Sequence, residues 1–189
     1  MKVKPVKRTS RTDSALARAG ARRTRLTGRR PRTSVPSMPA FKLNNILVPV
    51  DFSECSRKSL QYAVPFARQF GAAITLIYVI QPYLPVSDIA PIDAEVIDLR
   101  LRETGEKELS KLQKSMDPAI ATSTALRIGS PHVEIVRAAR DLSADLIILS
   151  THGRTGLSHV LMGSTTERVV RHAGCPVLVL RENEHEFIN

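Results

Sequence analysis

The chain of 189 residues has little of what marks several other classes of protein. It has 2 cysteines, no tryptophan and only 4% aromatic residues. The two cysteines, Cys55 and Cys175, are too few for a disulfide framework and lack metal-ligand spacing. No apolar run approaches the roughly 20 residues of a membrane-spanning helix, and no apolar signal segment begins the chain. We therefore expect no membrane segment, no metal site and a cytoplasmic location.

Acidic residues are scarce at the start of the chain. Residues 1–40 carry 12 Lys or Arg side chains against Asp13 alone, whereas residues 41–189 carry 16 basic and 17 acidic residues. The formal net charge of +10 therefore belongs to the tail and not to the body. The tail also lacks aromatic residues and apolar periodicity, which predicts disorder over residues 1–40.

Four interpretations of this basic tail are open. It could be an arm that binds nucleic acid or acidic lipid, a transit peptide, or residues left from cloning. We favour the fourth, a true start at Met38, because Met38-Pro39-Ala40-Phe41 leads directly into a regular pattern. Contact with nucleic acid is expected only through residues 1–40.

From Asn44 onward, short apolar runs alternate with amphipathic segments. The runs predict strands, and the segments between them predict helices. The strands are predicted over residues 46–50, 73–79, 122–128, 145–150 and 176–180. The helices are predicted around residues 60–70, 92–116, 131–139 and 164–173. This alternation predicts an α/β fold of the Rossmann-like kind, a doubly wound, parallel five-stranded sheet with helices on both faces.

Three local expectations accompany this pattern. Residues 164–167, Ser-Thr-Thr-Glu, have the spacing of a capping box in which Ser164 would be the N-cap. Gly105 is predicted to weaken the helix over residues 92–116. Cys175 is interpreted as a small, buried apolar residue.

Residues suited to binding a ligand follow three of the predicted strands. Pro49-Val50-Asp51, Gly129-Ser130 and the stretch from Ser150 to Thr165 all lie at strand carboxyl ends, where open α/β sheets bind ligands. Glycines and a helix N-terminus can cradle a phosphate. Within the last stretch, Gly153, Gly163, Ser164 and Thr165 would do so, with His152 and Arg154 as further contacts. Asp51 would accept from ribose hydroxyls or help to hold Mg²⁺. Each feature alone is explained by turns and helix caps, but together they predict a nucleotide site.

Other chemistry has little support in the chain. The Gly-Lys-Ser/Thr sequence of P-loop NTPases is absent, and no residue set provides an oriented nucleophile or general base. No His/Cys cluster suggests metal ligation. We therefore expect no catalytic residues, and enzymatic activity is left as an alternative rather than a prediction.

The pattern Ser150-x2-Gly153-x9-Gly163-Ser164 resembles the ATP-binding signature of the universal stress protein family, Gly-x2-Gly-x9-Gly-Ser/Thr. Only the first glycine differs. The stretches ILVPVDFSECS and STHGRTGLSHVLMGSTTERVVRHAGCPVLVL agree with the family as well. The resemblance covers about Asn44 to Arg181, which indicates a UspA-like domain over residues 41–182 between the basic tail and a short C-terminal tail, 183–189.

The resemblance implies a fold like that of the adenine nucleotide alpha hydrolases and a pocket for ATP, with or without Mg²⁺. It implies that Pro49, Val50, Asp51 and Val79 line the adenine and ribose end. The phosphates would be held by Ser150, Gly153, Arg154, Gly163, Ser164 and Thr165. Dimeric relatives pair through the last strand, which implies a homodimer interface at Val177, Leu178, Val179 and Leu180.

Three functions are consistent with these observations. The first is a stress-response protein that binds ATP and acts as a nucleotide-dependent regulatory homodimer. The second is a family member that binds no nucleotide and acts through dimerisation and unidentified protein partners. The third is a slow ATPase on the same kind of sheet.

Overall fold

The computed structural model describes residues 42–82, 94–151 and 162–181. The tails predicted over residues 1–40 and 183–189 lie outside these ranges. In chain order the elements are β1 (Asn45–Pro49), α1 (Glu54–Phe70), β2 (Ala73–Ile80), α2 (Ala94–Lys114), β3 (Thr122–Ile128), α3 (Pro131–Asp141), β4 (Leu146–Ser150), α4 (Ser164–His172) and β5 (Val177–Leu180). The predicted fold class is confirmed. The described elements agree closely with the predicted ranges except α1, which begins at Glu54 and thus well before the predicted residue 60, because Ser53 caps it.

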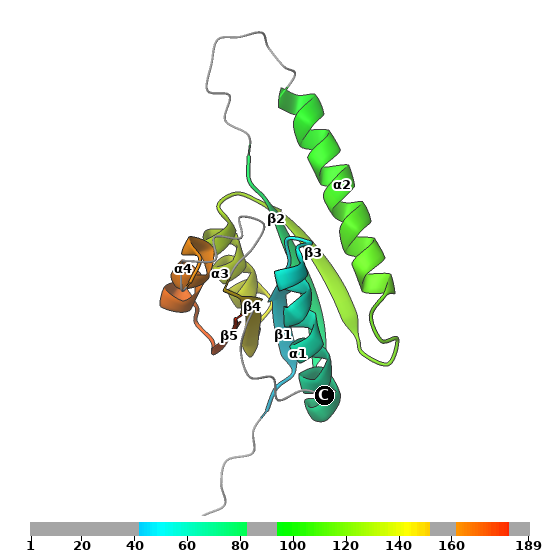
Figure 1. Cartoon of the computed structure of the whole chain (residues 1–189), viewed down its shortest axis with the longest axis vertical. Coiled ribbons are helices and arrows are strands. Elements are labelled where there is room, and N and C mark those ends of the chain that lie inside the picture. Colours follow the sequence, from blue (N-terminus) through cyan, green and yellow to red (C-terminus); the bar gives the residue numbers. More distant parts are fainter. Residues whose placement is uncertain (1–41, 83–93, 152–161, 182–189) are drawn as a thin grey trace, which may run out of the picture. The chain divides into compact units, whose positions relative to one another are not determined.

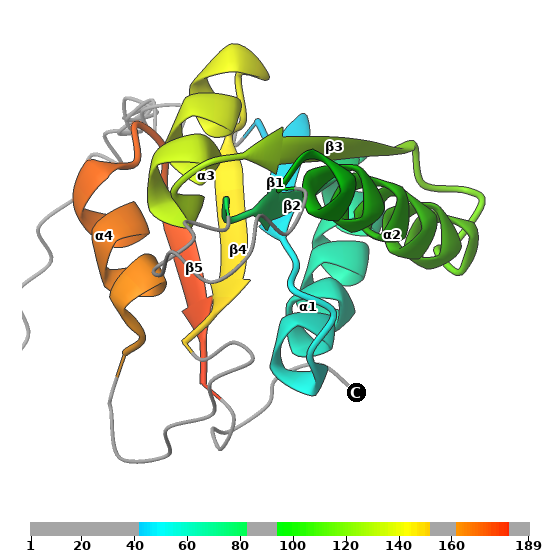
Figure 2. The same cartoon turned by 90° about the horizontal axis from the view of Figure 1, so that it is seen from above.

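All pairings between these strands are parallel, and the strand order is β3-β2-β1-β4-β5 (Figure 1). Helices α1 and α2 lie on one face of the sheet, and α3 and α4 lie on the other (Figure 2). Along β1, Ile46 and Val48 pack with α1, whereas Leu47 packs with α3 and α4. Apolar residues therefore follow one another without alternation along most of β1, β2 and β4, because both faces of the sheet are covered.

None of the helices in the described ranges is both long enough and apolar enough to span a bilayer.

Helix α1 begins and ends at local signals in the sequence. Ser53 is its N-cap, and the Ser53 Oγ accepts a hydrogen bond of 3.2 Å from the backbone N–H of Ser56. At the other end, Gly71 has a φ of +70°, the left-handed conformation that glycine adopts without strain. Its backbone N–H donates to the carbonyl of Ala67.

Gly105 has a packing role in α2 that the sequence does not reveal. It is buried, and a Cβ at this position would lie 3.0 Å from the ring of Tyr78 on β2 and 3.1 Å from Leu126 on β3. The missing side chain therefore allows α2 to approach the sheet closely. The low helix propensity of glycine is offset by this contact.

The predicted capping box at the start of α4 is wrong. Gly163 is the N-cap, Ser164 is the first helical residue, and no side chain caps the helix. The Glu167 carboxylate does not reach back but pairs with Arg171 at 2.7 Å. Instead, the backbone N–H of Gly163 donates to the carbonyl of Thr151 at 2.8 Å, so that the helix start is attached to the end of β4.

Cys175 is half-buried, so the expectation of a buried residue is only partly met. It packs beside the apolar cluster under α3 and α4. This burial, together with the negative charge of Asp145, raises the pKa of the Cys175 thiol.

Asp145 joins the start of β4 to the start of β1. Its Oδ2 accepts hydrogen bonds from the backbone N–H groups of Asn44 at 2.7 Å and Asn45 at 3.0 Å. These bonds stabilise the carboxylate form and hold the pKa of Asp145 below its ordinary value. A carboxyl of this kind stabilises the fold above its unfolded-state pKa, and the contribution is lost as the pH falls through the folded-state pKa.

We expect Asp145→Asn to lower the free energy of unfolding at neutral pH, because the amide cannot replace a charged acceptor. The difference from the parent protein should shrink as the pH falls through the lowered pKa of Asp145. Urea denaturation at a series of pH values measures this. Asp141→Asn is the control, since Asp141 is exposed and pairs with the Arg127 side chain at 3.3 Å. A difference that does not change between neutral and acid pH would contradict the assignment.

Gly163 gives a second test of the fold. A Cβ on this residue would lie 2.8 Å from the Thr151 carbonyl oxygen, a backbone atom that cannot move without disturbing β4. We expect Gly163→Ala to cost about 1–3 kcal/mol of the free energy of unfolding, the usual range for overpacking.

Gly174→Ala is the matched control, because a Cβ there meets nothing within 4 Å. Its effect should stay within about 0.5 kcal/mol, as for most surface substitutions. Denaturant titration compares the two variants. Equal stability of Gly163→Ala and Gly174→Ala would show that the start of α4 is not closely packed on β4.

Candidate functional site

A cavity of about 450 Å³ opens at the carboxyl ends of β1, β2 and β4. Strand order reverses between β1 and β4, because the chain turns from one side of β1 to the other at that point. This switch point is where open α/β sheets bind ligands. The cavity is lined by Pro49, Val50, Asp51, Ser56, Ile77, Tyr78, Val79, Ile80, Gln81, Leu101, Pro131, Ile135, Leu149, Ser150, Thr151, Gly163, Ser164, Thr165 and Thr166.

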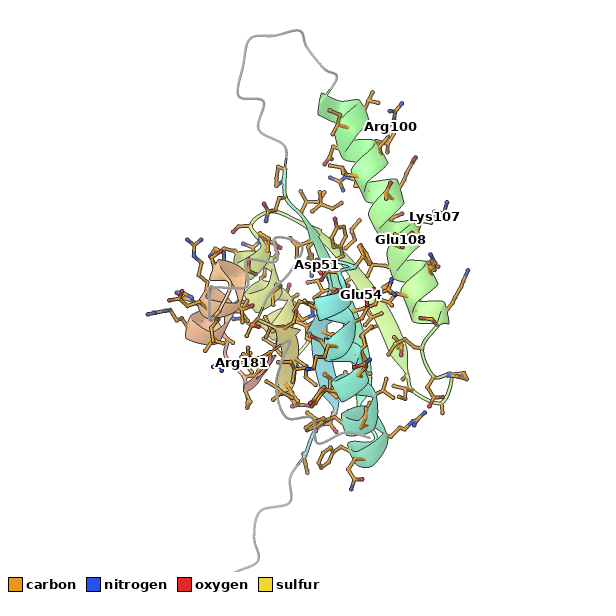
Figure 3. The ribbon with its side chains drawn as sticks, viewed as in Figure 1. Asp51, Glu54, Arg100, Lys107, Glu108 and Arg181 are labelled. Atoms are coloured by element: carbon orange, nitrogen blue, oxygen red, sulfur yellow. The ribbon has the colours of Figure 1, made fainter. Side chains whose placement is uncertain are left out.

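The end of β1 supplies a carboxylate to the cavity wall. The backbone N–H of Val50 donates to the Ile77 carbonyl at 2.8 Å, which holds the chain against β2. The Asp51 Oδ1 then accepts from the backbone N–H of Ser53 at 3.0 Å and from the Ser53 Oγ at 2.5 Å. Figure 3 shows Asp51 at the start of α1, near Glu54. The hydrogen bonds orient this half-buried carboxylate at the cavity.

Phe52, between Asp51 and the N-cap of α1, has a φ of +65°. A bulky residue in this left-handed region is uncommon and costs conformational energy. Its ring packs on the ring of Tyr78, with centroids 4.7 Å apart. This aromatic contact compensates for the strained turn that carries Asp51 to the cavity.

The end of β4 and the start of α4 form the opposite wall. The backbone N–H of Thr151 donates to Leu180 of β5 at 2.8 Å, and the Thr166 Oγ1 donates to the Ser150 carbonyl at 2.9 Å. With the Gly163 bond to Thr151, these contacts hold the first turn of α4 beside the strand end. The first N–H groups of a helix have no intrahelical partner, and they favour an anion. Ser164 and Thr165 add hydroxyl groups to this positively polarised wall.

The structure brings eight of the predicted site residues to this one cavity. They are Pro49, Val50, Asp51, Val79, Ser150, Gly163, Ser164 and Thr165. Gly129 does not line it but lines a neighbouring cavity, because its strand, β3, ends one position further out in the sheet. His152, Gly153 and Arg154 lie outside the described residues.

Several lining residues were missed by the sequence analysis. Tyr78 precedes the predicted Val79 and Gln81 follows the end of β2, so extending the predicted site along this strand end would have included both residues. Leu101 of α2 and Ile135 of α3 carry no such signal, because they reach the cavity through helix packing. They add apolar surface to the wall.

The site offers little for metal binding by the protein alone. Asp51 is the single carboxylate among the described residues that line the cavity. Across the described ranges, no group of three or more His, Cys, Asp or Glu side chains is placed to hold a metal ion. A divalent cation here would need ligands from a bound molecule and from water.

Comparisons with known proteins identify the family to which the chain belongs. The family model described as "Universal stress protein family" matches residues 42–181. The universal stress protein MJ0531 of Methanocaldococcus jannaschii is 36% identical over 142 residues, which cover 75% of this chain and 84% of that protein.

Two solved structures are similar in fold. The structure of MJ0577, also from Methanocaldococcus jannaschii, has a TM-score of 0.68 at 27% identity and covers 77% of this chain and 100% of that one. UspA from Lactobacillus plantarum has a TM-score of 0.64 at 29% identity and covers 75% of this chain and 100% of that one. With its parallel sheet, its cavity at the switch point and these relatives, the chain belongs to the universal stress protein family.

Proposed function

We propose that this chain binds ATP in the cavity at the strand ends and acts as a nucleotide-dependent regulatory homodimer in the response to stress. One observation carries the nucleotide part. The signature residues Ser150, Gly163 and Ser164 line a single cavity at the switch point of the sheet, beside the N-terminus of α4. The cavity's volume of about 450 Å³ falls within the usual range for small-molecule sites, ~300–1,000 Å³.

The cavity lining combines apolar and polar groups, as a nucleotide requires. Apolar side chains of Val50, Val79 and Leu149 would offer surface for an adenine ring. The Asp51 carboxylate, next to Val50 in the chain, would accept hydrogen bonds from ribose hydroxyls. The first turn of α4, with Ser164 and Thr165, would receive the phosphates.

Mg²⁺ would enter this site together with the phosphates. Mg²⁺ commonly keeps several waters and is held by one or two carboxylates plus substrate phosphates. Asp51 is the lining carboxylate that fits this role, and its Oδ1 is already engaged by Ser53. The cation would reduce the charge of the polyphosphate, while the protein would orient the nucleotide.

The departure from the family signature, Ser150, is half-buried at the end of β4. The Thr166 Oγ1 donates to its carbonyl. A serine hydroxyl could donate to a phosphate, which is typically worth about 0.5–1.5 kcal/mol net. This gain would offset the crowding that the extra side chain causes.

We expect calorimetric titration with ATP, in the presence and absence of Mg²⁺, to show binding to the unmodified protein. Ser150→Gly should change the affinity by about tenfold or less, because the two opposing effects are similar in size. Ser164→Glu should abolish binding, because its carboxylate would occupy the place of a phosphate. The variant should stay folded, since a negative charge favours a helix N-terminus.

Thr104→Glu is the matched control for added charge, because Thr104 is exposed on α2 and lines none of the described cavities near α4. It should bind ATP as the unmodified protein does. If the unmodified protein and Ser150→Gly both fail to bind while folded, the nucleotide proposal is wrong. If only Ser150→Gly binds, the chain acts without nucleotide, through dimerisation and partner contacts.

The dimer part of the proposal rests on the difference between the two sheet edges. Edge strand β5 presents Val177, Leu178 and Val179, all half-buried, and its described pairing is with β4 alone. The opposite edge, β3, begins with the polar residues Thr122, Ser123 and Thr124. An apolar edge strand is a template for pairing, whereas a polar edge resists it. A second copy of the chain would cover β5.

We therefore expect a homodimer at micromolar concentration that Val179→Lys converts to monomers, as measured by sedimentation velocity. Thr124→Lys at the polar edge is the control and should leave the dimer intact. Circular dichroism would confirm that both variants are folded. A monomeric unmodified protein at that concentration would refute the dimer.

A further inference from the structure

A second cavity, of about 420 Å³, adjoins the first at the N-termini of α3 and α4. It is lined by Gln81, Pro82, Gly129, Ser130, Pro131, His132, Ser164, Thr165 and Arg168. Four of these residues, Gln81, Pro131, Ser164 and Thr165, also line the first cavity. The first turn of α4 is therefore a wall common to both cavities, and a ligand that crosses this turn would enter the second.

Arg168 gives the second cavity a positive charge. It lies one helical turn after Ser164 and Thr165, on the same side of α4, and its side chain is exposed. Within the part of the chain that the structure describes, its guanidinium has no hydrogen bond or ion pair. The charge is therefore available to a ligand.

The carboxylates of α3 and α4 do not neutralise this charge, because each is paired with another arginine. Glu134 pairs with Arg137 at 3.0 Å, Asp141 with Arg127 at 3.3 Å and Glu167 with Arg171 at 2.7 Å. The first turns of the two helices contribute further positive potential, since the dipole of a helix is positive at its N-terminus.

His132, in the first turn of α3, lies in the same positive region. Its Nδ1 is 3.0 Å from the Ser130 Oγ, and both residues line the second cavity. Burial is the main reason that the pKa of His132 lies below its ordinary value. The positive charges of Arg168 and His172 on α4 lower this pKa further. The Arg168 guanidinium and the His132 imidazole thus line the same cavity, and no described carboxylate lines it. A bound anion would stabilise the guanidinium and would favour protonation of the imidazole.

We propose that the second cavity is a phosphate subsite in which Arg168 determines how strongly the protein prefers a nucleoside triphosphate to a monophosphate. This inference rests on the proposed nucleotide binding. The base would lie among the apolar residues of the first cavity, and the phosphate chain would pass the first turn of α4. Its outer phosphates would then meet Arg168 and the Ser130–His132 pair. A monophosphate would end before this subsite and would not contact Arg168.

The test is calorimetric titration of AMP and ATP into the unmodified full-length protein and into Arg168→Gln. Removing the guanidinium should weaken ATP binding about tenfold, the effect expected for a hydrogen bond to a charged group. The affinity for AMP should change less than threefold. Arg140→Gln removes the same charge from the neighbouring helix α3 at an exposed residue outside both cavities, and it should alter neither affinity.

Nuclear magnetic resonance of the His132 ring gives a readout that does not depend on affinity. ATP should raise the pKa of His132 because an anion favours the imidazolium, whereas AMP should leave it nearly unchanged. In the unliganded protein, Arg168→Gln should also raise this pKa, because a repelling cation is removed.

The outcomes separate the two proposals. If the unmodified protein binds neither AMP nor ATP, the proposed function is wrong and this inference falls with it. If both nucleotides bind and Arg168→Gln lowers the two affinities equally, or lowers neither, the nucleotide site is supported and the subsite is refuted. A loss confined to ATP, with the matching change at His132, supports the subsite.

Discussion

The attachment of α4 to the end of β4 determines the shape of the two cavities at the strand ends. Two hydrogen bonds make this attachment, from the Gly163 backbone N–H to the Thr151 carbonyl and from the Thr166 Oγ1 to the Ser150 carbonyl. Both cavities share the helix turn that these bonds hold. A displacement of α4 would therefore change both cavities together. Gly163 is required here for a reason independent of any ligand, because its missing side chain lets two backbones meet.

This has a bearing on how glycine signatures are interpreted. A glycine next to a phosphate site is usually explained by the approach of the ligand. At Gly163 the atom closest to a hypothetical Cβ belongs to the protein. The residue alone is thus weak evidence for nucleotide binding. The convergence of strand ends from β1, β2 and β4 on one cavity is stronger evidence, because protein packing does not require these polar groups to gather there.

Much of the fold could be predicted from the sequence, because its determinants are local. Ile46, Leu47 and Val48 form an apolar run without alternation, and such a run indicates a strand covered on both faces. The polar residues at the start of β3, Thr122, Ser123 and Thr124, likewise suit its place at an edge of the sheet. The start of α4 was mispredicted, because Ser164 and Glu167 have the right spacing for a capping box but the tertiary contact with Thr151 prevails. Leu101 and Ile135 could not be predicted as site residues, since their positions depend on how α2 and α3 pack on the sheet.

Gly105 shows what such helix placement implies for the cavity. The residue lies outside the cavity, yet it permits α2 to approach Tyr78, and both Tyr78 and Leu101 of α2 line the site. The width of the cavity therefore depends on a residue that does not line it. A larger side chain at this position would push α2 away from the sheet and change the shape of the cavity, while every residue that lines the cavity stays the same.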